Sequence, residues 1–128
     1  NFGPPHCWMA PTDVVRRAGG FCDTLQWSED WDILWRIGIH ASALVPVDYV
    51  GALYRQHPQS QYATTSKANR ARGYTILAAR MADEFLKRAE LFEVYGPDLF
   101  WGVWTALKNA RANGVPWGEL QYLRDSLV

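Results

Sequence analysis

The chain contains 128 residues, of which 48% are hydrophobic and seven are tryptophan, so it can form one folded core and is not a disordered polypeptide. Its thirteen basic and thirteen acidic residues cancel, which argues against a nucleic-acid-binding surface built on bulk charge. No apolar run approaches the roughly 18 residues that a membrane span requires, so we expect no transmembrane segment. The first residues carry no signal-peptide pattern, and Cys7 and Cys22 lack a metal-binding spacing, so we expect free thiols in the cytoplasm.

The first predicted elements are a short strand and a short helix. The apolar run His6–Ala10 is typical of a strand, and Pro11 closes it. A helix is expected to follow, with Thr12 as its N-cap. Gly19 and Gly20 should end this helix, because glycine enters the left-handed conformation at a helix C-terminus at little cost.

The next helix has an acidic first turn. Ser28 is a good N-cap residue, and Glu29 and Asp30 follow where negative charge is favoured by the helix dipole. Arg36 is expected to be structural, held on the helix against a carboxylate. A carboxylate fixed at the edge of a core is a candidate general base, although dipole complementation alone also explains such a turn. The predicted buried face of this helix consists of residues at helical spacing: Trp31, Leu34, Trp35 and Gly38.

Residues 43–54 predict two short strands, because they are rich in β-branched and aromatic side chains. Pro46 indicates a sheet edge or a bulge in the first of them. The second strand would end at Arg55 and His57, beside the end of a sheet, where functional sites are common.

The second half predicts about three amphipathic helices after Ser66. The first carries a stripe of apolar residues from Tyr74 to Phe92, with Asp83–Lys87 and Glu84–Arg88 pairs on its solvated face. Gly96-Pro97-Asp98 should break it. A second helix is expected to end at Asn113-Gly114, and a last one follows Pro116 with its apolar positions at Leu120, Leu123 and Leu127.

Three ordered motifs occur in the first half: Ala18-Gly19-Gly20-Phe21-Cys22-Asp23, then Glu29-Asp30-Trp31-Asp32 with Arg36, and then Tyr54-Arg55-Gln56-His57 with Ser60. This series resembles the second half of a family-2 glycosyltransferase of the GT-A fold, over about residues 1–66. The resemblance implies a helix-dominated α+β fold with a few short strands in the first half, as part of a GT-A α/β fold. Residues 1–65 would be the acceptor-side part of the catalytic domain, and residues 66–128 a C-terminal helical extension.

The resemblance also implies roles for individual residues. Asp30 would be the base that deprotonates the acceptor hydroxyl, and Glu29 would help to orient the acceptor. His57 is similar to the family's third ligand of a Mn²⁺ or Mg²⁺ ion, and Arg55 could bind diphosphate oxygens. His6 could face an acceptor sugar, although a single histidine beside a buried strand is more often structural.

The family's nucleotide-binding half, with its Asp-x-Asp metal motif, is expected to precede residue 1. Asp30-Trp31-Asp32 has that spacing but lies at a helix start, so we do not assign it that role. The intact enzyme would use a nucleotide-sugar donor and a carbohydrate or lipid-linked acceptor, whereas this chain alone should be inactive. Exposed strand edges would favour its self-association.

Two other interpretations remain open, a stand-alone carbohydrate-binding module and a helical interaction module. Seven tryptophans and six tyrosines suggest stacking on sugar rings. Against this, Trp31, Trp35 and Trp104 lie on apolar helical stripes and are expected in the core.

Overall fold

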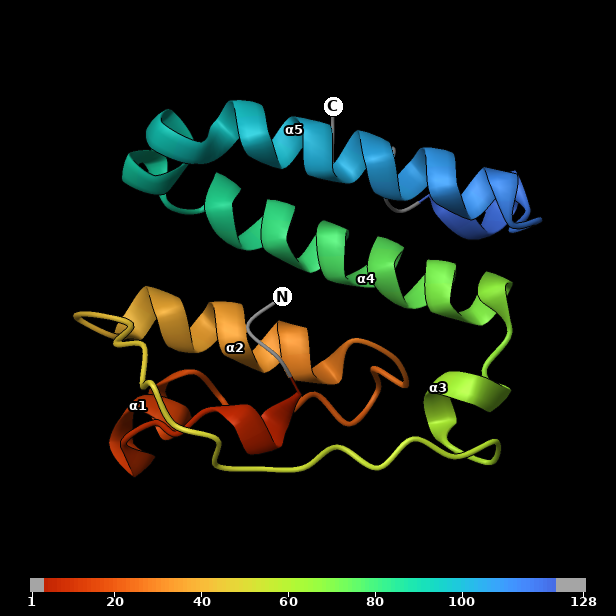
Figure 1. Ribbon diagram of the computed structural model, residues 1–128. Helices are drawn as coiled ribbons and strands as arrows, with labels where there is room; N and C mark the ends of the chain where they lie inside the picture. The colour runs from red at the N-terminus through yellow and green to blue at the C-terminus, as the bar shows by residue number, and fades with distance from the viewer. Residues whose placement is uncertain (1–3, 122–128) are drawn as a thin grey trace. The chain divides into compact units, whose positions relative to one another are not determined.

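A computed structural model describes residues 4–121 of the chain, and all of its regular elements are helical (Figure 1). By their contacts the residues form two compact units, Asn1–Thr64 and Thr65–Val128, each with its own hydrophobic core. In chain order the elements are the 3-10 helix η1 (Pro5–Cys7), α1 (Thr12–Arg17), α2 (Glu29–His40), α3 (Gln61–Thr64), α4 (Lys67–Leu86), α5 (Ala89–Ala112) and the 3-10 helix η2 (Trp117–Leu120).

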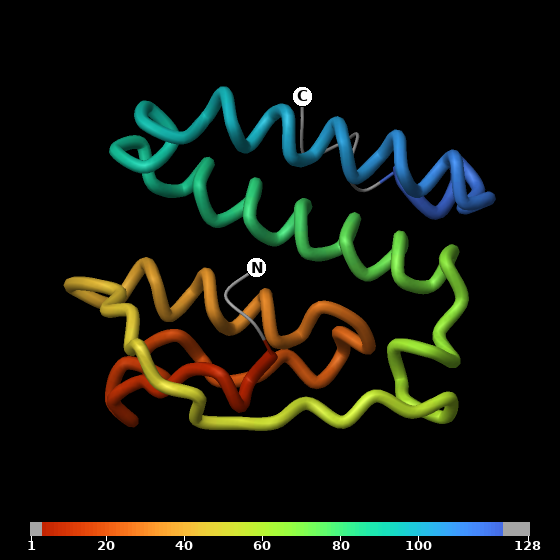
Figure 2. Tube along the Cα trace, viewed as in Figure 1, coloured from red at the N-terminus to blue at the C-terminus, as the bar shows by residue number. Residues whose placement is uncertain are grey.

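The predicted α+β fold is wrong, because residues 4–121 contain no β-strand. The expected strand at His6–Ala10 is partly a 3-10 turn. The backbone of residues 43–54 is irregular (Figure 2), and these residues are exposed. A strand is stable only when a second strand takes up its backbone donors and acceptors. No other strand lies within the described residues, so the β-type composition of this segment leaves Val45 78% and Leu53 93% exposed.

The first unit is built on the packing of α1 against α2. The α1 helix ends as predicted at two glycines with positive φ, 79° for Gly19 and 68° for Gly20. The Gly20 amide donates to the Val15 carbonyl at 3.1 Å and the Gly19 amide to the Arg16 carbonyl at 3.0 Å. These two bonds form a Schellman motif. Thr12 is the first helical residue and not the cap, a position that Pro11 occupies.

The buried face of α2 differs from the predicted one. Ile33 and Ile37 are 0% and 3% exposed and pack on Val14 of α1 and on Ala18, which follows α1, whereas Trp31 is 39% exposed. The prediction that Trp31, Leu34, Trp35 and Gly38 form the buried face of α2 is therefore wrong. Both stripes have helical spacing, and only the partner helix selects between them.

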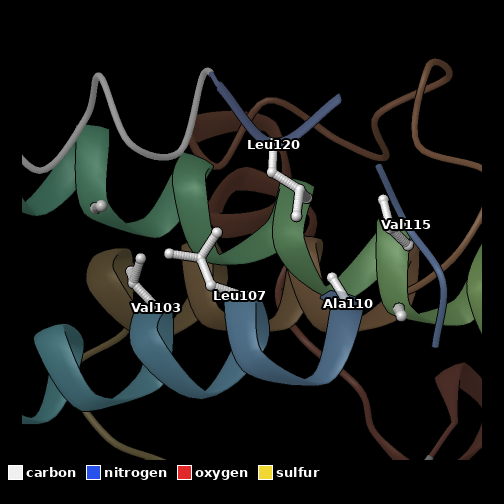
Figure 3. Packing of buried hydrophobic residues seen from close by; sticks show 7 residues of the cluster. Val103, Leu107, Ala110, Val115 and Leu120 are labelled. Carbon is white, nitrogen blue, oxygen red and sulfur yellow. The ribbon is translucent and has the colours of Figure 1, made fainter. Parts of the chain in front are cut away.

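The second unit is a pair of long helices, α4 and α5, joined by Lys87 and Arg88 (Figure 1). The Ser66 hydroxyl caps α4 by accepting the Asn69 amide at 3.1 Å. Side chains of α5 and of the segment after it meet α4 in one core (Figure 3). Its buried members are Ala71, Ala82, Val103, Leu107, Ala110, Val115 and Leu120.

Ion pairs on the surface of the second unit include both predicted pairs. Lys87 lies 2.6 Å from Asp83, and Arg88 lies 2.8 Å from Glu84. A third pair ties η2 to α4, because the Arg72 guanidinium bonds the Glu119 carboxylate at 2.6 Å. This hydrogen bond lowers the pKa of the Glu119 carboxyl.

The predicted helix break at Gly96-Pro97-Asp98 is also wrong. The chain breaks at Lys87 and Arg88, and α5 then continues through Pro97. A proline inside a helix costs roughly 3 kcal/mol. Packing of α5 on α4, which buries Val103 and Leu107 after the proline, offsets that cost. Of the last predicted helix, the structure contains η2 with Leu120 buried, and Leu123 and Leu127 lie outside the described residues.

No helix in residues 4–121 is both long enough and apolar enough to cross a membrane.

Candidate functional site

The start of α2 carries the candidate catalytic carboxylates. Ser28 occupies the N-cap position as predicted, but its φ of 66° and ψ of 24° are left-handed and its hydroxyl makes no capping bond. The serine is 6% exposed, and its Oγ has no hydrogen-bond partner. Its carbonyl accepts the Asp32 amide at 2.9 Å, while the Trp31 amide donates to Asp30 Oδ1 at 2.9 Å. Asp30 therefore satisfies an amide of the first turn in place of the serine hydroxyl.

Among the described residues, Ser28 is the single non-glycine residue with a positive φ. Left-handed geometry costs an L-residue roughly 1–2 kcal/mol. Such strained residues cluster at functional sites, where the surrounding structure holds them in place. Here the strained residue directly precedes Glu29 and Asp30.

We expect Ser28→Gly to raise the free energy of unfolding of the first unit by about 1 kcal/mol, because glycine enters this conformation freely. Ser28→Ala keeps the strain and removes the unbonded hydroxyl, so it should change stability by at most about 0.5 kcal/mol. Urea unfolding of the two variants measures both effects. A loss of about 1 kcal/mol in the alanine variant would instead identify the hydroxyl as a cap.

The carboxylates of the acidic motif have different environments. Glu29 and Asp30 are partly exposed, whereas Asp32 is 0% exposed and forms an ion pair with Arg36. The predicted structural role of Arg36 is confirmed. Asp32 is thus held by a cation inside the unit, and Asp30 and Glu29 are the carboxylates that a bound molecule can reach.

Arg36 also joins the first two motifs of the sequence. Its Nε donates to Asp32 Oδ2 at 3.1 Å, its Nη2 donates to the Gly20 carbonyl at 2.8 Å, and its Nη1 bonds the Ala18 carbonyl. The guanidinium therefore binds the C-terminal end of α1 while it rests on α2. The Asp32–Arg36 spacing of four residues is a sequence signal for the ion pair. Nothing in the sequence indicated the bonds to Ala18 and Gly20.

The third motif lies on an irregular segment and not at the end of a strand. Arg55 and His57 are both exposed. The Ser60 amide donates to the His57 carbonyl at 3.0 Å, which makes a turn that leads into α3. The structure therefore corrects the expected setting of both residues.

Contacts of α3 place this turn beside the loop that leads into α2. Gln61 Nε2 donates to the Gln26 carbonyl at 3.2 Å, and the rings of Trp27 and Tyr62 are 6.2 Å apart. Segments more than thirty residues apart in the sequence thus lie side by side. No pattern in the sequence predicted these contacts.

His6 contacts the other end of the third motif. Its ring stacks on Tyr54, with centroids 5.6 Å apart and an interplanar angle of 13°. Both side chains are exposed. The stack brings the N-terminal segment to the Tyr-Arg-x-His residues, which the sequence did not indicate.

The metal ion implied by the resemblance needs several ligands, because Mn²⁺ and Mg²⁺ prefer six-coordinate sites. Residues 4–121 contain no group of three or more His, Cys, Asp or Glu side chains that could hold a metal ion. His57 by itself supplies one nitrogen. The described residues therefore do not form a site for either ion on their own.

Comparisons of the chain with protein-family models, with curated proteins and with solved structures found no match. The resemblance therefore depends on the three motifs and on their arrangement in the first unit.

Proposed function

We propose that the chain is the acceptor-binding and catalytic-base part of an inverting glycosyltransferase. The observation that supports this most is that α2 and the loop before it are bonded to the first motif and to the residue that follows the third motif. Arg36 bonds the Gly-Gly motif to the acidic helix, and the Gln61–Gln26 bond brings the turn after His57 beside the same helix start. Motifs that act in one site are expected to lie together in this way.

In the proposed reaction the oxygen of an acceptor hydroxyl attacks the anomeric carbon of a nucleotide-sugar. The bond from that carbon to the diphosphate breaks, and the nucleoside diphosphate leaves on the opposite face, which inverts the anomeric centre. Asp30 takes the proton of the hydroxyl as the new bond forms. Glu29 accepts a hydrogen bond from a neighbouring acceptor hydroxyl. Asp32 takes no part in the reaction, because its carboxylate is buried and forms an ion pair with Arg36.

The donor side of the proposed site requires residues beyond those described. Arg55 would bind diphosphate oxygens and His57 would supply one ligand of a Mn²⁺ or Mg²⁺ ion in the intact enzyme. The acceptor would be a carbohydrate or a lipid-linked sugar, with His6 beside it through its stack on Tyr54. The proposed location is the cytoplasm, where cysteines that are not joined in a disulfide, such as Cys7 and Cys22, stay reduced.

The direct test is transfer of a labelled sugar by the encoded polypeptide in full length, assayed with UDP- and GDP-sugars and Mn²⁺. We expect the wild-type polypeptide to transfer the sugar and the Asp30→Asn variant to lose this activity. Residues 1–128 alone should give no heat of binding with the same donors in calorimetry. Micromolar binding of a donor by residues 1–128 would contradict the assignment of the donor side of the site to other residues. Absence of transfer with every donor would contradict the proposed activity.

A carbohydrate-binding module is the second candidate, and the exposed tryptophans favour it. The expectation that Trp31 and Trp104 lie in the core is wrong, since they are 39% and 50% exposed. Trp101 and Trp117 are 63% and 62% exposed as well. Calorimetry with neutral oligosaccharides separates the candidates, because a binding module would bind sugar without a nucleotide and independently of Asp30.

A further inference from the structure

The α5 helix has apolar residues on two opposite faces. One face packs on α4 through Val103, Leu107 and Ala110. The other is exposed, with Val94 at 65%, Trp101 at 63% and Trp104 at 50% of their full accessible area. We call this second surface the outer α5 face, which comprises Glu90, Val94, Pro97, Trp101, Trp104 and Lys108, all exposed.

The spacing of the outer α5 face is that of a helix-pairing seam. Its positions 90, 94, 97, 101, 104 and 108 are separated alternately by four and three residues. That alternation is the a/d pattern of a coiled coil, in which one helix packs along another. The structure thus offers a second helix an apolar stripe about three heptads long, with two tryptophans near its middle.

The charges of this face are complementary to those of a second copy of the same helix. Glu90 and Lys108 lie at opposite ends of the stripe, equally far in sequence from residue 99. If two copies of α5 pack antiparallel about that residue, Glu90 of each copy lies opposite Lys108 of the other. A parallel pair would instead oppose like charges at both ends, which is unfavourable.

The same register pairs the apolar residues. Residue 97 lies opposite residue 101 of the second copy, and residue 94 lies opposite residue 104. Pro97 therefore meets the Trp101 ring and Val94 meets the Trp104 ring, and each contact is made twice. Self-complementarity of this kind is what a two-fold symmetric interface requires.

We propose that the chain forms a two-fold symmetric dimer in which the outer α5 faces pack antiparallel. Two α4–α5 pairs then build a four-helix bundle, with the α5 helices at its centre. A lipid surface fits this face less well, because Glu90 lies on the stripe and Glu93 and Asp98 flank it, and these carboxylates oppose an anionic membrane. The proposal is independent of the glycosyltransferase activity.

Sedimentation velocity of the full chain across the micromolar range tests the proposal. The wild type should change from monomer to dimer as concentration rises. Glu90→Lys and Lys108→Glu should each weaken the dimer about tenfold or more, because each turns two attractive contacts into repulsive ones. The variant that combines Glu90→Lys with Lys108→Glu should dimerise again, because the lysine then at position 90 of each copy would lie opposite the glutamate at position 108 of the other copy. Lys67→Glu on α4 is the control with the same charge change as Lys108→Glu and should dimerise normally.

Trp101→Ala and Trp104→Ala test the centre of the interface. Each should weaken the dimer by roughly 30-fold or more, as central tryptophans do. Both rings are exposed in the single chain, so circular dichroism should show the helix content of the wild type. A wild type that stays monomeric throughout would overturn the proposal. So would a double charge variant that fails to dimerise, or tryptophan-dependent binding of the monomer to phosphatidylserine vesicles.

Discussion

Arg36→Met is expected to destabilise the α1–α2 unit by about 3–5 kcal/mol, the cost of removing one partner of a buried ion pair. The Asp32 carboxylate is 0% exposed and would lose its guanidinium. The carbonyls of Ala18 and Gly20 would lose a donor at the same time. Because small domains are only marginally stable, a loss of this size should largely unfold the unit.

Hydrogen exchange of the amides in α2 measures this effect without interference from the second unit. We expect the amides of Glu29–His40 to lose most of their protection in Arg36→Met, while those of α4 keep theirs. The control is Asp32→Leu combined with Arg36→Met, which replaces the pair by apolar side chains and should restore much of the stability. Full protection in the single variant would mean that the guanidinium does not hold α1 to α2.

Asp30→Asn is expected to lower the turnover of the proposed enzyme by roughly 10²–10⁴-fold, the range that general-base catalysis supplies. Asparagine keeps the shape of the side chain and an oxygen that can accept the Trp31 amide, which Asp30 bonds at 2.9 Å. Stability should therefore fall by at most about 1 kcal/mol, the scale of a charge at a helix N-terminus. Donor affinity should hardly change, because the base contacts the acceptor.

Glu29→Gln is the matched control, since it removes the same charge from the same helical turn. Turnover, donor affinity and melting temperature of both variants are measured in the full-length polypeptide. If Asp30 only complements the helix dipole, Asp30→Asn will show modest destabilisation and nearly normal turnover. Equal losses of activity in the two variants would remove the reason to assign the base to Asp30 specifically.

Local interactions determined the parts of this protein that the sequence predicted. The two glycines end α1 because glycine enters left-handed geometry at little cost, and α2 begins after Ser28 because the acidic residues of its first turn favour a helix N-terminus and Asp30 accepts the Trp31 amide. The Asp83–Lys87 and Glu84–Arg88 pairs and the bond of Arg36 to a carboxylate follow from a spacing of four residues. Each of these features depends on neighbours within one helix or one turn.

Tertiary contacts decided the rest. Residues 43–54 have the composition of strands, but a strand forms only against a partner strand, and residues 4–121 hold none. Pro97 stays inside α5 because packing on α4 outweighs the local cost of the proline. The links of α2 and its preceding loop to the other two motifs depend on bonds between distant segments, from Arg36 to Gly20 and from Gln61 to Gln26. Since such contacts leave no periodic trace in a sequence, the site's geometry became visible only in the folded chain.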